Sequence, residues 1–176
     1  ACTATINTSY GSKVVIPGTG VVLNNEMDDF SVQPGVANAF GLLGAEANAV
    51  APGKRPLSSM SPTIVLQDGK PNIAIGAAGG PKIISAVLVQ LVAMLDLGKT
   101  PQEAMAMPRI HQQWSPDELM VEKAMPDEVT AALEKRGHKV RELNSLSVAH
   151  TVARSADGKS FVGAADPRAG GKAEGW

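Results

Sequence analysis

The sequence predicts a mixed α/β protein in which a buried helix packs directly on a sheet. The first observation is the segment 72–81, where a β-branched strand and a turn of small residues lead straight into an apolar helix. The second is a pair of hairpin turns, Asp68-Gly69 and Asp157-Gly158, each between apolar runs. The third is the composition, because 44% hydrophobic residues and a net charge of −1 are typical of a globular chain.

Length and composition also exclude several classes of protein. With 176 residues we expect a single domain over residues 1–176, long enough to bury a sizeable core. No apolar run reaches membrane-spanning length, so no membrane span is expected. Aromatic residues are only 3% and no Lys/Arg cluster interleaves with them, so no nucleic-acid partner is expected either. The single Cys2 cannot form a disulfide within the chain, which leaves the compartment open.

The N-terminal residues alternate in polarity. Thr3, Thr5 and Asn7 alternate with apolar neighbours, which predicts a strand with one polar face. That face is either solvated or the polar wall of a pocket. The chain begins without an initiator methionine or a signal-like segment, so we expect it to be a piece of something longer.

Acidic and amide side chains cluster after the apolar run Val21–Leu23. Three carboxylates, Glu26 and Asp29 among them, and two carboxamides lie within residues 24–29. The cluster is either an exposed turn that caps its own backbone or a site for a cation or an ammonium group. The spacing of a calcium loop is absent. The long loop 31–51 that follows is typical of a functional segment such as a lid.

A serine-rich loop precedes the predicted sheet. Ser58 and Ser59 lie in the segment Lys54–Pro62, between two prolines that restrict the backbone. Their hydroxyls could bind a carboxylate, or the segment could simply be a turn. The turn Asp68-Gly69 then pairs a strand at 63–66 with one at 72–75 and so places the glycine segment at the far end of the hairpin.

Five small residues, 76–80, separate the second strand from the helix predicted over 83–97. Backbone amides without a Cβ in the way can approach a ligand, and a helix N-terminus behind them favours an anion or the oxyanion of acyl transfer. A tight packing turn explains the same residues equally well. Pro81 fits the first helical position. A mostly buried helix is predicted by apolar residues that recur at spacings of three and four, namely Ile84, Val87, Leu88, Leu91 and Leu95.

The rest of the chain is predicted as short elements. They are a capped helix from Thr100 to Met107, a strand at 119–122, a helix at 126–136 ended by Gly137, and strands at 148–154 and 160–164. His111 and Trp114 are predicted on a loop, where His111 is a candidate general base but such a histidine is more often structural. Asp166 and Arg168 are predicted to form a surface ion pair of little energetic weight.

Four motifs together resemble the small subunit of the γ-glutamyltranspeptidases. In chain order they are Thr5-Ile6-Asn7, the segment Leu23–Phe30, the segment Lys54–Pro62 and Gly79-Gly80. The resemblance covers the chain from Ala1 to Asp166-Pro167-Arg168. It implies the αββα four-layer sandwich of the N-terminal nucleophile hydrolases, built jointly by a large and a small subunit that one precursor produces by cutting itself.

The resemblance also implies catalytic roles. Thr5 is similar to the threonine that hydrogen-bonds the nucleophile, whereas the nucleophile itself, the first threonine of the family's small subunit, is not in this chain. Gly79 and Gly80 are similar to the oxyanion hole. The segment Pro34–Gly44 corresponds to the family's lid loop, with Phe40 at the place of its gating aromatic.

Substrate-binding roles are implied in the same way. Asn7, Glu26 and Asp29 resemble the residues that hold the α-amino group of the γ-glutamyl substrate. Ser58 and Ser59 resemble those that hydrogen-bond its α-carboxylate. The chemistry of the side chains agrees, because an ammonium needs acceptors and a carboxylate needs donors.

The function implied is that of a γ-glutamyl hydrolase and transferase, which acts on glutathione and related γ-glutamyl amides through a γ-glutamyl-enzyme intermediate. The acceptor would be an amino acid, a peptide or water. The partner would be the large subunit of the same precursor, which supplies an arginine for the substrate carboxylate. No cofactor and no metal are implied, the compartment would be periplasmic or extracellular, and this chain alone is expected to be inactive.

Two other functions stay open. The first is a related acylase that removes the side chain of a β-lactam, which would not need a clamp for an amino acid. The second is a non-catalytic remnant or binding module whose glycine segment holds a phosphate. A P-loop is not indicated, because no Lys-Ser/Thr follows the glycines.

Overall fold

The computed structural model describes residues 4–175 and divides the chain into two compact units. The smaller unit extends to Ser59, and the larger unit runs from Met60 onward. The single domain predicted over residues 1–176 stays a prediction. The mixed α/β class is confirmed by the larger unit.

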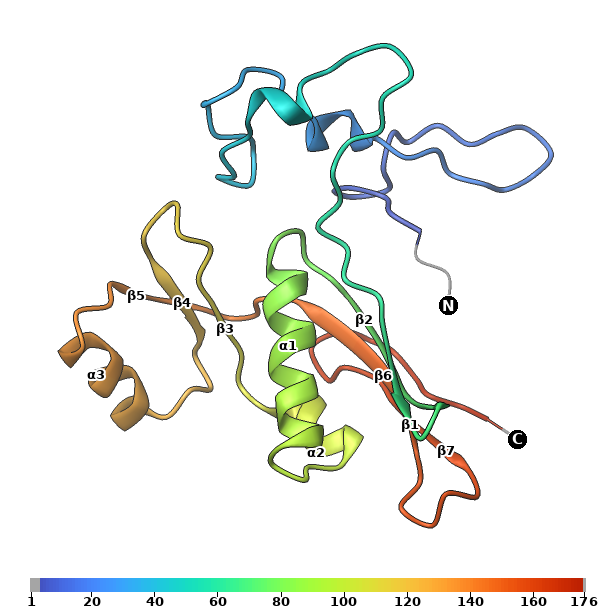
Figure 1. Ribbon diagram of the computed structural model, residues 1–176, viewed down its shortest axis with the longest axis vertical. Coiled ribbons are helices and arrows are strands. Elements are labelled where there is room, and N and C mark those ends of the chain that lie inside the picture. The colour runs from blue at the N-terminus through green and yellow to red at the C-terminus, as the bar shows by residue number, and fades with distance from the viewer. Residues whose placement is uncertain (1–3, 176) are drawn as a thin grey trace. The chain divides into compact units, whose positions relative to one another are not determined.

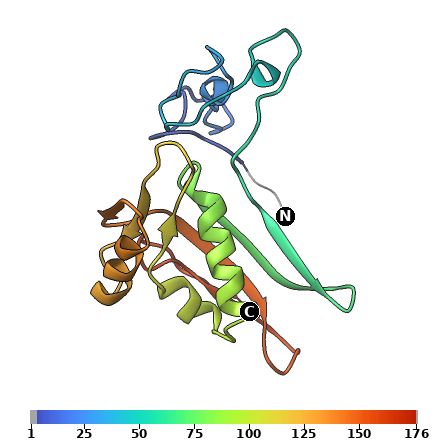
Figure 2. The same cartoon turned by 60° about the vertical axis from the view of Figure 1, so that its left-hand side comes forward.

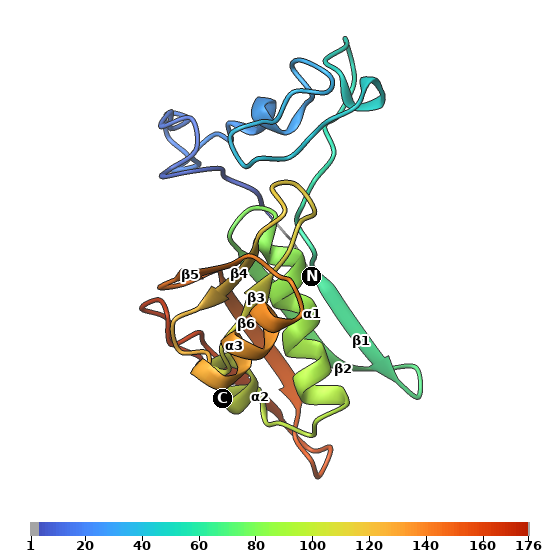
Figure 3. The ribbon, with the colours of Figure 1, turned by 90° about the vertical axis from the view of Figure 1, so that its left-hand side faces the viewer.

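A four-stranded antiparallel sheet forms the centre of the larger unit (Figure 1). Its order is β1-β2-β6-β7, and its strands are β1 (Thr63–Gln67), β2 (Lys70–Ala78), β6 (Val148–Arg154) and β7 (Phe161–Ala164). The predicted hairpin is present, with Thr63 opposite Ile75 and a register shift between Val65 and Leu66. In Figures 2 and 3 its turn stands clear of the helices. The other end of β2 leads into Gly79 and Gly80, and it pairs with β6 as far as Ala78 opposite Val148.

Helix α1 (Lys82–Leu95) covers one face of this sheet. The core is apolar and joins both layers, and its buried members are Ile73, Ile75, Ile83, Val87, Met105, Ala149, Ala153 and Ala164. Burial of each larger aliphatic side chain contributes about 1.5–3 kcal/mol to folding. Helix α2 (Pro101–Ala106) closes the end of the core and begins with the predicted capping box, because Thr100 and Glu103 bond each other's backbone amides.

A three-stranded sheet lies beside α1, with α3 (Asp127–Lys135) at its outer end (Figure 1). It consists of β3 (Ile110–His111), β4 (Leu119–Glu122) and β5 (Val140–Leu143), with β4 and β5 parallel. The sequence did not predict β5. His111 was predicted on a loop but lies on β3 and is buried.

The glycine segment and its helix differ from the prediction in two respects. Strand β2 continues to Ala78, because β6 supplies backbone partners up to the pair Ala78–Val148, so Gly79, Gly80 and Pro81 remain between strand and helix. Pro81 is the N-cap of the helix and does not take the predicted first helical position. Helix α1 has apolar residues on all sides. Val87 is buried as predicted and Leu91 packs against the core, whereas Ile84, Leu88 and Leu95, also predicted to be buried, are exposed. The buried residues of α1 are Ile83, Ala86, Val87, Gln90 and Ala93.

The smaller unit consists mostly of turns. Its helical segments are the 3₁₀ turns η1 (Glu26–Asp29) and η2 (Glu46–Asn48). Residues 13–23 form a small hairpin in which Val15 and Val22 pair. The strand predicted at the N-terminus is absent from residues 4–7; the Gly11 amide bonds the Asn7 carbonyl and closes a turn there. Thr3 lies outside the described residues.

Candidate functional site

The acidic turn η1 carries the two carboxylates predicted to bind an ammonium group. The Asn24 side chain accepts a hydrogen bond from the Glu26 amide at 3.1 Å, and Phe30, buried, follows the turn. This holds Glu26 and Asp29 half-buried on one turn. Glu26 Oε1 is buried without a hydrogen-bond partner among the described residues. Because buried acceptors in native proteins are normally paired, this oxygen is a candidate acceptor for a donor that enters the site.

Asp29 has an unusual affinity for its proton. Burial, a hydrogen bond with Glu26 and the negative charges of Glu26 and Asp28 raise its pKa to about 6. Two carboxylates that crowd each other in this way favour either a shared proton or a bound cation. A cation with N–H donors, such as an ammonium group, would also satisfy the unpaired oxygen of Glu26.

A hollow of about 310 Å³ in the smaller unit is bordered by both Asp29 and Ser59. Much of the predicted lid loop also borders it, including Val36, Asn38 and Leu42. Asn38 organises that loop, because its side-chain oxygen accepts hydrogen bonds from the amides of Phe40 and Leu42. The structure therefore brings one predicted ammonium ligand, one predicted carboxylate ligand and the lid to a single cavity.

Asn48, which the sequence did not single out, joins the acidic turn to the serine loop. Its side-chain nitrogen donates to the Asp29 carbonyl at 2.7 Å, and its side-chain oxygen accepts from the Leu57 amide at 3.0 Å. Ser58 and Ser59 follow Leu57 directly, and neither serine lacks an interaction partner within the chain. An asparagine in a polar loop carries no pattern that would have identified this role.

Thr5 and Asn7 are both half-buried. The Asn7 amide donates to Asn25 Oδ1 at 2.9 Å, and Asn25 immediately precedes the acidic turn. The side-chain oxygen of Asn7 accepts from the Thr8 amide, also at 2.9 Å. Asn7 is thus brought next to η1, as its predicted role requires.

Gly79 and Gly80 form the turn from β2 into α1. Their φ angles are +142° and +61°, values that side-chain-bearing residues rarely adopt. The Gly80 carbonyl accepts a hydrogen bond from the Ile83 amide at 3.0 Å, while the amides of Gly79 and Gly80 donate to no residue in the described part of the chain. These amides lie at a helix N-terminus, where an anion or an oxyanion is favoured.

The predicted site residues are divided between the units. Thr5, Asn7, Glu26, Asp29, Ser58 and Ser59 belong to the smaller unit, whereas Gly79 and Gly80 belong to the larger unit. The common catalytic site that the resemblance implies for Thr5, Gly79 and Gly80 therefore stays a prediction.

His111 is held at both ring nitrogens. Its Nδ1 lies 2.8 Å from Ser85 Oγ, and its Nε2 lies 2.9 Å from Gln113 Oε1. The other end of the Gln113 amide donates to the Ser115 carbonyl, so Oε1 must accept from His111. Nε2 is therefore the donor to Gln113, and Nδ1 shares a hydrogen bond with the Ser85 hydroxyl. A buried histidine with both nitrogens occupied in this way is structural.

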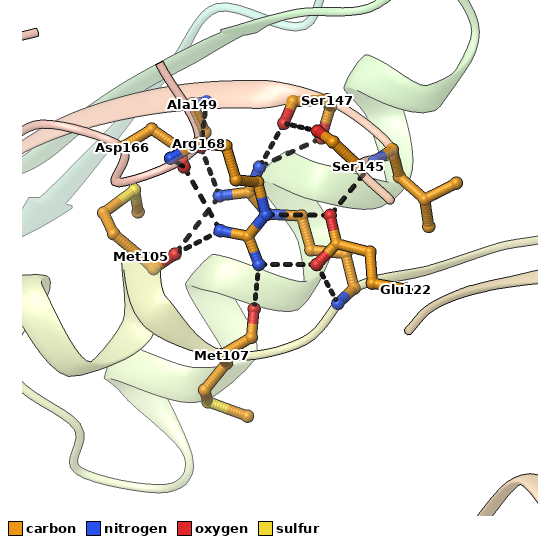
Figure 4. A network of polar contacts seen from close by, with 10 residues as sticks. Met105, Met107, Glu122, Ser145, Ser147, Ala149, Asp166 and Arg168 are labelled. Carbon is orange, nitrogen blue, oxygen red and sulfur yellow. Dashed lines mark hydrogen bonds and ion pairs between the residues drawn. The ribbon is translucent and has the colours of Figure 1, made fainter. Parts of the chain in front are cut away.

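Asp166 and Arg168 do not form the surface pair that was predicted. Asp166 is only 1% exposed and pairs with Arg109, also buried, at 2.6 Å. Arg168 pairs with Glu122 at 2.5 Å and with Asp166 at 3.1 Å (Figure 4). Burial raises the pKa of Asp166, but hydrogen bonds from the Ala149 and Arg168 amides and the Arg109 guanidinium outweigh it and hold that pKa below its usual value. The prediction failed because Arg109 and Glu122 are distant in sequence.

Two kinds of feature are absent from residues 4–175. No helix there is both long and apolar enough to cross a bilayer. No group of histidine, cysteine, aspartate and glutamate side chains in that range is arranged to hold a metal ion.

The family of this chain is shown by comparison with known proteins. The family model described as "Gamma-glutamyltranspeptidase" matches residues 1–176. A protein of Escherichia coli K12 named "Glutathione hydrolase proenzyme" is 47% identical over 168 residues, which are 96% of this chain and 29% of that protein. The chain therefore spans about three tenths of the length of this relative.

Solved structures have the same fold. The T380A mutant of Helicobacter pylori gamma-glutamyltranspeptidase superimposes with a TM-score of 0.88 at 44% identity, covering 96% of this chain and 92% of that one. A cephalosporin acylase from Bacillus halodurans is more distant, with a TM-score of 0.79 at 27% identity over 94% of this chain and 30% of that one. The N-terminal nucleophile hydrolase fold that the motifs implied is confirmed by the first of these likenesses. The chain belongs to the gamma-glutamyltranspeptidase family.

Proposed function

We propose that this chain is the small-subunit part of an enzyme that hydrolyses and transfers γ-glutamyl groups, with glutathione and related amides as substrates. The observation that carries the proposal is the acidic turn, where Glu26 has a buried unpaired oxygen beside an Asp29 whose pKa is about 6. Such a pair is suited to a substrate that carries an α-ammonium group.

The remaining groups suit the other parts of a γ-glutamyl substrate. Ser59 borders the same hollow as Asp29, and Ser58 precedes it, so their hydroxyls are candidates to bind the α-carboxylate. Asn7, tied to the residue before the acidic turn, is a further candidate ligand for the α-amino group. A hollow of about 310 Å³ is enough for a small amino-acid moiety.

The reaction would be acyl transfer in two steps. A nucleophile, which the family resemblance assigns to a threonine outside this chain, attacks the γ-carbonyl and forms a tetrahedral oxyanion. The amides of Gly79 and Gly80 would donate to that oxygen, and Thr5 would hydrogen-bond the nucleophile. The amine then leaves with a proton, and water or another amine attacks the resulting ester and releases the γ-glutamyl product.

The large subunit of the same precursor is the proposed partner. Ile84, Leu88 and Leu95 follow each other at helical spacing on α1, and Leu88 is 59% exposed. A helix that is apolar on all sides is normally buried on all sides, so we expect another part of the enzyme to pack on this face. About seven tenths of the length of the Escherichia coli relative lies outside the matched region, which is ample for such a cover. By resemblance, the assembled enzyme would be periplasmic or extracellular and made by self-cleavage.

The proposal is tested on the assembled enzyme, matured from the complete precursor, with two anilides that differ only in the α-amino group. The first is γ-glutamyl anilide, and the second is glutaryl anilide, which lacks that group. We expect the wild type to prefer the first by about a hundredfold or more in kcat/KM, because a buried charge pair would otherwise lose its partner. Asp29→Asn should remove most of this preference, whereas Glu46→Gln, on the exposed turn η2 of the same unit, should retain it.

Each other outcome identifies an alternative. Equal hydrolysis of both anilides by the wild type would favour the acylase. A folded precursor that hydrolyses neither would favour a non-catalytic module.

A further inference from the structure

Gly79 packs against the backbone of the segment that leads into β6. A Cβ built on Gly79 would lie 3.1 Å from Ser147 Cβ, 3.2 Å from Ser147 Cα and 3.3 Å from the Leu146 carbonyl oxygen. The β2–β6 ladder ends one residue earlier, at Ala78 and Val148. Any displacement of the segment Ser145–Ser147 would therefore be transmitted directly to the Gly79 turn.

The segment Ser145–Ser147 belongs to no strand or helix, and two buried charged side chains hold it. Arg109 Nη1 donates to the Ser147 carbonyl at 2.7 Å and to Ser147 Oγ at 3.2 Å. Glu122 Oε1 accepts from the Leu146 amide at 3.0 Å. Arg109 and Glu122 are 1% and 2% exposed, so solvent cannot replace these bonds.

Two further charges hold Arg109 and Glu122 in turn. Asp166 pairs with Arg109 and accepts from the Ala149 amide at 2.7 Å, while Arg168 pairs with Glu122. The cluster of Arg109, Glu122, Asp166 and Arg168 is thus electrically balanced. Buried ion pairs are often no more stabilising than apolar residues of the same size, so overall stability does not by itself explain the cluster. The rigid, planar guanidinium groups and the fixed carboxylates of this cluster are well suited to holding backbone groups in one position.

We propose that Arg109 is a positioning residue for acyl transfer, which fixes Ser147 and through it the Gly79 turn, so that the amides of Gly79 and Gly80 are held ready for the oxyanion. The inference rests on the proposed function of these glycines. Arg109 does not touch substrate in this account; it acts through the main chain of Ser147.

Lysine variants of the two arginines in the assembled enzyme test this directly. Arg109→Lys keeps the positive charge beside Asp166. It removes the guanidinium group whose Nη1 donates to Ser147. Arg168→Lys is the comparison variant, because Arg168 belongs to the same cluster but reaches the segment Ser145–Ser147 only indirectly, through Glu122. Its other partners are Met105, Met107 and Asp166. We expect Arg109→Lys to lower kcat about tenfold with KM within about twofold, and Arg168→Lys to have a clearly smaller effect on kcat. Rates are divided by the amount of γ-glutamyl-enzyme formed in the burst, so incomplete maturation does not count as slow turnover.

A second measurement does not depend on activity. In enzyme labelled with ¹⁵N-glycine, Arg109→Lys should shift the amide resonances of Gly79 and Gly80. Gly69 and Gly158, in the hairpin turns, should not move, because they lie at the opposite ends of β2 and β6. Ser147→Gly, which removes the Cβ that faces Gly79, should shift the same two resonances if Arg109→Lys does not fold.

Two results would overturn the inference. One is an Arg109→Lys enzyme with unchanged kcat and unchanged Gly79 and Gly80 resonances. The other is an equal effect of Arg168→Lys, which would mean a general structural role for the cluster. A folded wild-type enzyme without γ-glutamyl transfer would instead refute the proposed function, and the resonances would still report whether Arg109 positions the turn.

Discussion

The side chain of Asn48 donates a hydrogen bond of 2.7 Å to the carbonyl oxygen of Asp29. Its other end accepts from the Leu57 amide, next to Ser58. One carboxamide therefore sets the separation between the turn proposed to bind the substrate ammonium and the loop proposed to bind its carboxylate.

Asn48→Ala should weaken substrate binding without slowing the chemistry. The loss of two hydrogen bonds allows the acidic turn and the serine loop to move apart, which affects the ground state and the transition state alike. We expect KM for γ-glutamyl anilide to rise about tenfold with kcat little changed, measured by steady-state kinetics on the assembled enzyme. The exposed Asn144, changed to alanine, serves as control. Unchanged KM would show that Asn48 does not hold the two segments together.

The raised pKa of Asp29 predicts a pH-dependent KM. Below about pH 6 the free enzyme holds a proton on Asp29, and an arriving ammonium must displace it. Binding therefore releases a proton, so KM should fall as the pH rises towards 6 and become level above it. Asp29→Asn should show a high KM that does not vary with pH in this range. A wild-type KM that is flat from about pH 5 to about pH 7 would contradict the assignment of the ammonium to Asp29.

Gly80→Ala should reduce turnover with little effect on KM. At φ +61° an alanine is strained, and relief of that strain would turn the amide away from the developing oxyanion. The expected loss in kcat is on the order of a hundred- to a thousandfold, as for other single oxyanion donors. Gly98→Ala is a close control, because Gly98 has φ +62° with open space around it. A similar loss in both variants would point to strain alone.

The buried cluster should be essential for stability, unlike a surface pair. Asp166→Ala leaves the guanidinium of Arg109 buried without a carboxylate, which should lower the free energy of unfolding by about 3–5 kcal/mol. Glu118→Ala breaks only the exposed contact with Arg141 and should cost less than about 1 kcal/mol. Denaturant unfolding of the assembled enzyme compares the two. Equal and small losses would mean that water replaces the missing carboxylate.

The exposed face of α1 predicts where the large subunit docks. Leu88→Gln should weaken the association of the two subunits, observed as dissociation on dilution in size-exclusion chromatography, because an uncompensated amide would be buried. Val129→Gln, on the largely polar helix α3, is the matched change and should leave the association intact. Association that survives Leu88→Gln unaltered would mean that α1 is covered by something else.

Local chemistry explains most of what could be predicted. The hairpin turn at Asp68-Gly69, the capping box at Thr100 and Glu103, and the stop at Gly137 depend on residues a few positions apart. The motif residues of the site were recognisable for the same reason, since each motif is contiguous. The strand β5 was missed because its partner β4 lies beyond a helix, and parallel pairing leaves little local pattern.

By itself, the sequence determined most elements of the larger unit, the family and the identity of the candidate ligands. Only the tertiary structure decided which face of α1 is buried, because helical periodicity is the same whichever side meets the sheet. It also turned Asp166 and Arg168 from an apparent surface pair into part of a buried cluster, since Glu122 approaches Arg168 across 46 residues of chain. Burial and charge pairing are properties of groups brought together by folding, and no spacing along the chain encodes them.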